Sequence, residues 1–338
     1  MRLATPRAWY TRDGSGFRAL KLFLLPLSWI WAAATARRIA RAEPADPGAP
    51  VICVGNLTLG GSGKTPVARA LAARLRARGT AVQLLCRSLT GSAGPLKVEA
   101  GRDAAREVGD EALMLAGDGL PVWVARDRLA GGRAAAAAGA AVIVMDDGHQ
   151  NPRLQKALSL VVVDGETRDG EWPFGDGGVF PAGPLREPLK AGLARADAVI
   201  LLLPADLSEP DPRLLAQLAG PPLLMARLQP LAPPPGGPLL GFAGVAKPWK
   251  VERALIAAGA QLIDFAPFAD HAPLSEAALQ LLQERADALG ARLITTEKDW
   301  VRLPTAWRER IVCWPVIARF DDEAALDRLL DGVLQLNR

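Results

Sequence analysis

Short runs of apolar residues alternate with longer amphipathic stretches from residue 51 to residue 228. Apolar runs bounded by turn residues are typical of strands buried on both faces of a parallel sheet, and the intervening stretches are long enough for crossover helices. The pattern therefore predicts an α/β fold with a doubly wound, mostly parallel sheet. The expected strands lie at residues 51–54, 81–86, 121–125, 141–147, 158–164 and 197–203.

The alternation stops at residues 229–238, QPLAPPPGGP, which are too rich in proline and glycine for a regular element. A chain of 338 residues exceeds what one core usually organises. We therefore expect a linker at residues 229–238, between a first domain at residues 46–228 and a smaller α/β domain at residues 239–338. The strands expected in the smaller domain lie at residues 239–245, 261–268, 292–299 and 311–316.

An apolar helix is expected at residues 22–35, LFLLPLSWIWAAAT, within an N-terminal segment of residues 1–45. The run is shorter than the roughly 20 residues that span a bilayer, and Pro26 lies inside it. Residues 1–41 hold eight basic side chains and one acidic side chain. We therefore expect a helix that lies in the membrane interface, with its arginines near anionic lipid.

Trp29 and Trp31 are able to reach headgroup depth from such a helix, but they lie two positions apart and would point to opposite flanks. The alternative is an apolar helix that simply packs on the protein.

Composition argues against several classes of protein. The basic residues in excess belong to the N-terminal segment and not to a folded face with stacking aromatics, so we expect no nucleic-acid partner. Cys53, Cys86 and Cys313 are widely spaced and form no Cys/His cluster. Neither disulfides nor structural zinc is expected, which indicates a reducing compartment. The sequence gives no reason to infer an obligate protein partner.

Residues 51–66, VICVGNLTLGGSGKTP, combine a strand, a glycine-rich turn and the start of a helix expected at residues 66–78. Unpaired N–H groups at a helix N-terminus favour a phosphate chain. In the nucleotide-binding loop Gly-x-x-x-x-Gly-Lys-Ser/Thr, the lysine reaches the phosphates and the hydroxyl ligates Mg²⁺, roles that Lys64 and Thr65 fit. Thr58 replaces the first glycine of that pattern. The alternative is a glycine-rich turn that binds no ligand.

Two acidic motifs are candidates for the site: one follows an expected strand, and the other precedes an expected helix. Asp146 and Asp147 come where an apolar strand ends, at the edge of a doubly wound sheet that faces ligand. Paired carboxylates beside a triphosphate indicate a Mg²⁺ site, although Asp-Asp-Gly is also common turn chemistry. Asp110 stands just before a helical run, where a helix N-cap and a catalytic carboxylate are both compatible with the local pattern.

Two further motifs carry candidate side chains. Arg186 and Glu187 lie in a proline-rich loop, FPAGPLREPL, where a guanidinium is suited to a phosphate oxygen and a surface salt bridge is the alternative. His271 precedes a helix whose expected N-cap is Ser275. Local spacing alone does not distinguish a catalytic role for His271 from an ordinary polar role.

The motifs VGNLTLGGSGKTP, VGDEALML, MDDGHQ, VVVDG, PAGPLREPL, GFAGV, FADH and TTEKD occur in this order and at these separations. Together they resemble the tetraacyldisaccharide 4′-kinase family of lipid A biosynthesis, from the apolar helix to Asp299. That family also has a residue other than glycine at the first loop position, which accounts for Thr58.

The resemblance implies ATP-dependent phosphorylation of the 4′-hydroxyl of tetraacyldisaccharide 1-phosphate, giving lipid IVA at the cytoplasmic face of the inner membrane. An interfacial helix suits a substrate with four acyl chains, which does not readily leave a bilayer.

The resemblance also implies roles for individual residues. Asp110 would accept the proton of the sugar hydroxyl with His271 as its partner, and Lys64, Arg186 and Glu187 would complete the catalytic set. The residues expected to hold ATP are Thr58, Gly60, Gly61, Ser62, Gly63, Lys64 and Thr65, and those expected to hold Mg²⁺ are Thr65, Asp146, Asp147 and Gln150.

The sequence departs from the family pattern in two places. After Asp-Asp-Gly the family usually has an aromatic residue or leucine, then glutamine and histidine, whereas this chain has His149, Gln150 and Asn151. Of the family's usual Arg-Gly-Tyr, only Arg87 is retained.

Two other classes remain as alternatives. A P-loop GTPase or another membrane-associated switch protein needs the guanine-reading motif Asn/Thr-Lys-x-Asp, but the lysine of TEKD at residues 296–299 comes one position late. A nucleotide-binding scaffold without catalytic activity would not need Asp110, Arg186 or His271.

Overall fold

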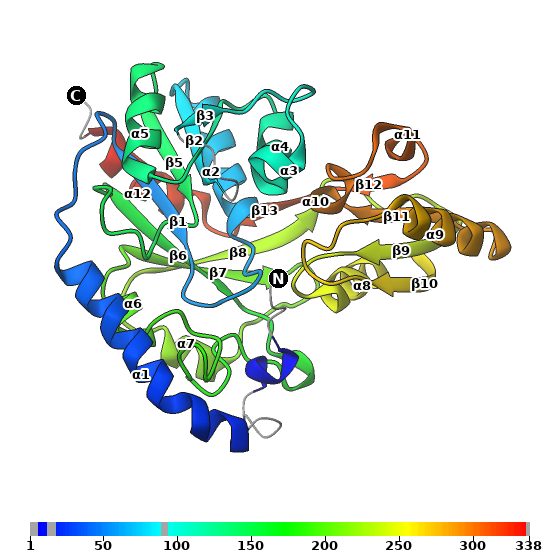
Figure 1. The fold of residues 1–338 in the computed structure, drawn as a ribbon, viewed down its shortest axis with the longest axis horizontal. Helices are drawn as coiled ribbons and strands as arrows, with labels where there is room; N and C mark the ends of the chain where they lie inside the picture. Colours follow the sequence, from blue (N-terminus) through cyan, green and yellow to red (C-terminus); the bar gives the residue numbers. More distant parts are fainter. Residues whose placement is uncertain (1–5, 12–17, 89–93, 336–338) are drawn as a thin grey trace.

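The architecture comes from a computed structural model that describes residues 6–11, 18–88 and 94–335. Nine strands within these ranges form one large sheet, shown in Figure 1. Its seven central strands are parallel, and the two edge strands pair antiparallel with their neighbours. In spatial order the strands are β13 (Val316–Phe320), β8 (Leu223–Pro230), β7 (Ala198–Pro204), β6 (Leu158–Asp164), β1 (Val51–Gly55), β5 (Val142–Asp146), β2 (Val82–Arg87), β4 (Val122–Ala125) and β3 (Leu96–Lys97).

The six strands expected in the first domain are all present, each within one residue of its expected ends. Strand β8 was not expected. It lies next to the edge strand β13, and its first four side chains alternate between exposed and buried. A strand that is only half buried does not form the continuous apolar run that marks the central strands.

Helices cover both faces of the large sheet, as a doubly wound fold requires. On one face, α2 (Lys64–Ala77), α4 (Asp110–Gly117) and α12 (Glu323–Gln335) share a core with the strands. The short helix α3 (Ala105–Val108) precedes α4. The other face is covered by α5 (Arg128–Ala137), α6 (Leu189–Leu193) and α7 (Pro212–Gln217). The helix expected at residues 66–78 begins two residues earlier than expected, at Lys64.

A second, smaller unit contains a four-stranded parallel sheet among the described residues. Its core has α8 on one face, and α9, α10 and α11 on the other. The strands are β10 (Gln261–Pro267), β9 (Pro238–Ala243), β11 (Arg292–Thr296) and β12 (Val312–Trp314), and the helices are α8 (Pro248–Ala257), α9 (Glu276–Ala288), α10 (Glu297–Trp300) and α11 (Thr305–Arg308).

The end of the chain differs from the expected division into domains. After β12, the chain crosses back to the large sheet, where β13 pairs with β8 and α12 packs on the core beside α2. Residues 316–335 therefore belong structurally to the first unit and not to a domain of residues 239–338. Because only Pro315 separates β12 from β13, the two strands look like one apolar run in the sequence.

The chain crosses twice between the two units. The first crossing is residues 231–237, inside the linker expected at residues 229–238, whose two ends belong to β8 and β9. The second is Pro315, and the carbonyl oxygen of Pro315 accepts a hydrogen bond of 3.0 Å from the N–H of Leu231. The two crossings thus lie side by side.

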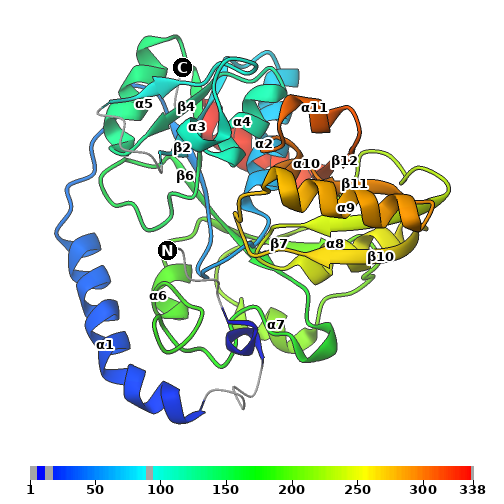
Figure 2. The same ribbon diagram turned by 45° about the vertical axis from the view of Figure 1, so that its right-hand side comes forward.

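Helix α1 (Arg18–Ala40) runs along the outside of the molecule, on the side away from the smaller unit in both views (Figures 1 and 2). Ser28 and Trp31 attach α1 to the loop between β6 and α6, by hydrogen bonds to Ala182 and Arg186. The opposite side of the helix exposes large apolar side chains, with Phe23 at 82% and Trp29 at 68% exposure. Across the described ranges, we find no helix with both the length and the apolar character needed to cross a bilayer.

Candidate active site

The glycine-rich loop between β1 and α2 has a backbone that only glycine adopts readily at two positions. Gly60 has φ +85° and Gly63 has φ +80°. At Gly63, a Cβ atom would also lie 2.2 Å from Cδ2 of Leu202. Helix α2 begins directly after this turn at Lys64, so its first unpaired N–H groups face the loop. Ser62 contributes a buried hydroxyl that has no hydrogen-bond partner. The loop therefore has the form of a phosphate cradle.

Thr58 takes part in the loop through its backbone. It forms an isolated antiparallel bridge with Leu185, an extended conformation that does not require glycine. The carbonyl oxygen of Thr58 accepts hydrogen bonds from Nδ2 of Asn56 at 2.8 Å and from Nε of Arg186 at 2.9 Å. Position 58 thus connects the glycine-rich loop to the loop that carries Arg186.

Asp146 lies at the end of β5, directly beside the first turn of α2. The hydroxyl of Thr65 donates a 2.9 Å hydrogen bond to Oδ2 of Asp146, while Oδ1 is buried without a hydrogen-bond partner. Burial and the charge of Glu111 raise the pKa of Asp146 to about 7, against the opposing charge of Lys64. A buried carboxylate oxygen that lacks a partner is unfavourable unless a cation or a donor occupies the adjoining space.

Asp147 follows in a left-handed conformation, with φ +56°. Its carboxylate lies 3.6 Å from Nζ of Lys64 and accepts a 2.8 Å hydrogen bond from Nη1 of Arg186. Burial alone would raise the pKa of Asp147, but these two cations hold it well below its usual range.

The donor set formed by the Thr65 hydroxyl and the two carboxylates fits Mg²⁺, which prefers oxygen ligands and keeps several waters and substrate phosphates. The described ranges contain no cluster of three or more His, Cys, Asp or Glu side chains that would enclose a metal by themselves. A cation here would therefore need oxygen atoms from bound phosphate or water.

Gln150, Arg186 and Glu187 form one connected group beside Asp147. Gln150 accepts from Arg186 at 3.3 Å, and its Nε2 donates to Asn56 at 2.8 Å and to Glu187 at 3.1 Å. Glu187 is buried and makes two short hydrogen bonds with Arg195, at 2.6 and 2.7 Å. The amide of Gln150 is therefore occupied in positioning its neighbours, and its expected role as a metal ligand stays a prediction.

His271 and Asp110 come from different units and meet at a hydrogen bond. Nδ1 of His271 lies 2.8 Å from Oδ2 of Asp110. Asp110 is the first residue of α4, and the N-cap is Gly109, whose φ of +92° and ψ of +145° favour glycine. The local alternative that Asp110 is itself an N-cap is therefore wrong. His271 has φ +57° in the loop before α9, whose N-cap is Ser275 as expected.

Further charged side chains surround this pair, and three of them, Lys298, Arg302 and Glu111, have no catalytic role predicted from the sequence. Lys298 lies 3.2 Å from Nε2 of His271, and Arg302 lies 3.9 Å from Asp110. Glu111 pairs with Lys298 at 3.2 Å. Burial opposes ionisation of Asp110, but the hydrogen bond with His271 and the charge of Lys298 outweigh it and lower the pKa of Asp110 to about 2.

The contacts of His149 and Asn151 are made with residues other than the paired aspartates. His149 is buried, with Nδ1 3.0 Å from the hydroxyl of Ser159 and Nε2 2.9 Å from the carbonyl oxygen of Gly192. Asn151 accepts from the N–H of Arg153 in a turn, and Arg87 is exposed at the end of β2. His149 therefore supports the packing between β6 and α6.

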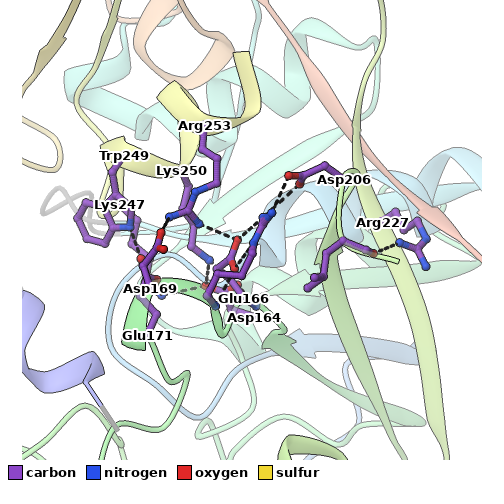
Figure 3. A network of polar contacts seen from close by, with 12 residues as sticks. Asp164, Glu166, Asp169, Glu171, Asp206, Arg227, Lys247, Trp249, Lys250 and Arg253 are labelled. Atoms are coloured by element: carbon purple, nitrogen blue, oxygen red, sulfur yellow. Dashed lines mark hydrogen bonds and ion pairs between the residues drawn. The ribbon is translucent and has the colours of Figure 1, made fainter. Parts of the chain in front are cut away.

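A second group of polar contacts joins the two units, between the end of β6 with the segment after it and α8 (Figure 3). Asp164 ends β6 and other acidic side chains follow it, while basic side chains lie at the N-cap of α8 and within α8. Asp164 accepts from Nζ of Lys247 at 2.9 Å and from Nζ of Lys250 at 2.6 Å. Burial opposes ionisation here as well, yet these lysines hold the pKa of Asp164 well below its usual range. Further members of the group include Glu166, Asp169, Glu171, Trp249 and Arg253.

Comparison with known proteins identifies the family. A family model described as tetraacyldisaccharide-1-P 4′-kinase matches residues 20–335. The chain belongs to this family. It is 64% identical to a tetraacyldisaccharide 4′-kinase of Phenylobacterium zucineum (strain HLK1) over 334 residues, covering 98% of this chain and 100% of the relative. It is 61% identical to the tetraacyldisaccharide 4′-kinase of Caulobacter vibrioides (strain NA1000 / CB15N), covering 98% and 99%.

A solved member of the 4′-kinase family has the same fold. The crystal structure of LpxK from Aquifex aeolicus, in complex with ATP, aligns with a TM-score of 0.72 at 24% sequence identity and covers 93% of this chain and 99% of that chain. The expected α/β fold is thus confirmed. Membership of the 4′-kinase family also argues against the GTPase alternative. In this chain the TEKD residues begin α10, where Thr296 is the N-cap and Asp299 is buried against Arg302.

Proposed function

We propose that the protein transfers the γ-phosphoryl group of ATP to the 4′-hydroxyl of tetraacyldisaccharide 1-phosphate, at the cytoplasmic face of the inner membrane. The observation that carries the proposal is the hydrogen bond between His271 and Asp110, which joins the two units beside the phosphate loop. The charge of Glu111, next to Asp110, contributes to the raised pKa of Asp146, so the pair and the loop lie within electrostatic reach of each other.

In this proposal the loop residues 58–65 hold the phosphate chain of ATP through backbone N–H groups and Lys64. Thr65, Asp146 and Asp147 would hold Mg²⁺, which when bound would neutralise charge on the phosphates. The raised pKa of Asp146 and its oxygen without a partner support this assignment, because a bound cation would supply the missing interaction.

Asp110 is the proposed proton acceptor. As the 4′-oxygen bonds to the γ-phosphorus, the bond from that phosphorus to the bridging oxygen of ADP breaks, and the hydroxyl proton moves to the carboxylate of Asp110. The low pKa of Asp110 ensures that this group is ionised at neutral pH. A carboxylate of low pKa is a weak base, which suits a loose transition state in which the proton leaves late.

Arg186 and Glu187 have separate proposed tasks. Arg186 bridges the carbonyl oxygen of Thr58 and the carboxylate of Asp147, and from this position it would stabilise negative charge that develops on the transferred group. Glu187 would act through Gln150 and Arg186, because its carboxylate is already engaged by Arg195.

The lipid substrate would reach the site from the membrane surface. Trp31, near the middle of α1, donates a 3.0 Å hydrogen bond to the carbonyl oxygen of Arg186, so the apolar helix lies against a proposed catalytic loop. The exposed apolar side of α1 would lie in the bilayer interface and bring this loop to the surface that holds the acyl chains.

The test is an assay of the full chain with labelled ATP and tetraacyldisaccharide 1-phosphate in mixed micelles with Mg²⁺. We expect labelled phosphate to appear at the 4′-position of the disaccharide. The same reaction with a disaccharide whose 4′-hydroxyl is blocked is the control, and it should yield no labelled lipid. ATP hydrolysis that the acceptor does not stimulate, with no labelled lipid, would overturn the proposal in favour of a nucleotide-dependent switch.

A further inference from the structure

Lys298 contacts the side of His271 that faces away from Asp110. It lies in the first turn of α10, and its Nζ is 3.2 Å from Nε2 of the imidazole. Its ammonium group is held by Glu111 at 3.2 Å and lies 3.7 Å from Asp270. Burial opposes the charge of Lys298, but these carboxylates raise its pKa above the ordinary value, so the group stays protonated at neutral pH.

An ammonium group has only donors, which decides the hydrogen-bonding role of the ring nitrogen that it contacts. Nε2 of His271 has to accept from Lys298, so it carries no hydrogen. The hydrogen of a neutral imidazole then sits on Nδ1, which lies 2.8 Å from the carboxylate of Asp110. A doubly protonated ring would point an N–H at the ammonium and would place two positive charges side by side.

We propose that Lys298 is a positioning residue that holds His271 as the tautomer with its hydrogen on Nδ1, so that the ring donates to Asp110. The proposal rests on the proposed function of Asp110 and His271. In this arrangement the Asp110 carboxylate is oriented by a hydrogen bond without being paired to a full imidazolium charge, and it remains able to accept the substrate proton.

The charged groups around the ring come from three elements. Asp110 and Glu111 lie on α4, Asp270 lies in the loop that carries His271, and Lys298, Asp299 and Arg302 lie on or next to α10. Asp270 is the one group here that favours the opposite tautomer, since its carboxylate is 3.6 Å from Nε2. Lys298 lies closer to Nε2 and also faces Asp270, so it separates the ring from that carboxylate electrostatically.

The backbone of His271 supports a fixed ring. Its φ of +57° is unusual for a residue with a side chain, and its N–H donates a 3.1 Å hydrogen bond to the carbonyl oxygen of Gly244. A strained conformation of this kind persists where the surrounding structure holds it, and such positions concentrate at functional sites. The backbone therefore fixes the direction of the ring, and the contact with Lys298 selects its tautomer.

The tautomer can be measured directly, because the chain has two histidines and the second one supplies an internal reference. Nε2 of His149 lies 2.9 Å from a backbone carbonyl oxygen, which accepts but cannot donate, so His149 carries its hydrogen on Nε2. The full chain labelled with ¹⁵N-histidine should give one ring of each tautomer near pH 7.5 in correlation spectra of the ring nitrogens. His271→Gln assigns the signals. A doubly protonated His271, or one with its hydrogen on Nε2, would overturn the proposal.

Kinetics test whether this arrangement matters for turnover. Lys298→Met removes the donor at similar length. We expect kcat at pH 7 to fall on the order of tenfold with little change in the KM for ATP. We also expect the acidic limb of the kcat/KM profile to move upward, because the charge of Lys298 helps to hold the pKa of Asp110 down. Lys298→Arg keeps charge and donors and should restore most of the activity.

Lys97→Met, on the exposed edge strand β3, is the matched control and should leave the pH profile unchanged. A Lys298→Met enzyme that matched this control in both kcat and the profile would exclude the positioning role. The NMR measurement uses the unaltered chain and so does not depend on how the variant folds. If Asp110→Ala kept full turnover, the proposed function of the pair would fail while the assignment of the tautomer would stand.

Discussion

His271 and Asp110 are 161 positions apart in the chain and share a hydrogen bond of 2.8 Å between Nδ1 and Oδ2. One residue belongs to the smaller unit and the other to α4 of the larger unit. The contact therefore depends on how the two units sit together, and it has consequences that separate catalysis from nucleotide binding.

Replacing the members of this pair should give losses that are not independent. We expect Asp110→Ala to lower kcat by about 10² to 10⁴, the usual range for general-base catalysis, and His271→Ala to lower it strongly as well. The double variant should lose far less than the product of the two single losses, because residues that act as one unit are not additive. Turnover of the three variants is the measurement. Strictly multiplicative losses would contradict a joint role.

Lys64→Ala should lower kcat on the order of a hundredfold, because the variant loses a charge that stabilises the transferred phosphoryl group. Lys64 also lies 3.6 Å from Asp147, a proposed Mg²⁺ ligand. The dependence of turnover on Mg²⁺ concentration should therefore differ between the variant and the wild type. Turnover against Mg²⁺ concentration measures both effects, with Lys97→Met as the control. Unchanged turnover would exclude Lys64 from the phosphate site.

The exposed side of α1 should determine membrane binding. Phe23→Asn together with Ile30→Asn removes two apolar side chains that are exposed and make this side of the helix apolar, and should weaken binding to anionic vesicles at least tenfold. Ile256→Asn together with Leu281→Asn removes two comparably exposed apolar side chains from the smaller unit and should leave binding unchanged. Vesicle sedimentation compares the pairs. Equal binding by both pairs would count against an interfacial helix.

Asp164 should be important for stability, because it is the shared partner of two lysines from the smaller unit. Asp164→Asn leaves both ammonium groups without their carboxylate, and we expect it to lower the free energy of unfolding by about 3 kcal/mol. Asp169→Asn removes a carboxylate that is largely exposed and should cost less than about 1 kcal/mol. Urea unfolding of the two variants measures the difference. Equal losses in the free energy of unfolding would show that the burial of Asp164 does not make its ion pairs more stabilising than the exposed one.

His149 should make the protein less stable in mild acid. Burial, only partly offset by the hydrogen bond to Gly192, lowers the pKa of His149 to about 4, against 6.5 for the unperturbed side chain. Between these values the unfolded chain binds a proton that the folded chain does not, so stability falls as the pH drops from about 6.5 towards 4. The total effect is on the order of 3 kcal/mol.

Urea unfolding at a series of pH values measures this loss. His149→Gln should flatten the dependence between pH 4 and 6.5, even if the variant is less stable at pH 7. A slope identical to that of the wild type would show that His149 is not the group that titrates.

The parts of the fold that are predictable from the sequence are those set by local patterns. Central strands such as β1 and β6 appear as apolar runs because both of their faces are buried. Strand β8 is not predictable from an apolar run because it is only half buried. Strand β13 is not recognisable as a separate strand because it follows β12 after a single proline. Neither the pairing of β13 with β8 nor the return of the chain to the large sheet leaves a local signal in the sequence.

In the candidate site, too, the residues that can be predicted are those that belong to a local motif. Lys64, Thr65 and Asp146 are recognisable because a phosphate loop and a strand-end carboxylate have fixed local forms. The contacts of Lys298 and Arg302 depend on the placement of α10 against α4, which residue spacing does not encode. The family resemblance pointed to the TTEKD motif, and only the three-dimensional arrangement shows its lysine against His271.

The return of β13 and α12 to the large sheet makes the smaller unit an insertion within the larger one. During synthesis, the strands from β1 to β8 leave the ribosome long before the segment that completes their edge and covers part of their core. The large unit can therefore complete its sheet only after the small unit has been synthesised. A chain cut before residue 316 would carry every proposed catalytic residue and still leave β8 as an uncovered edge, open to pairing with other chains.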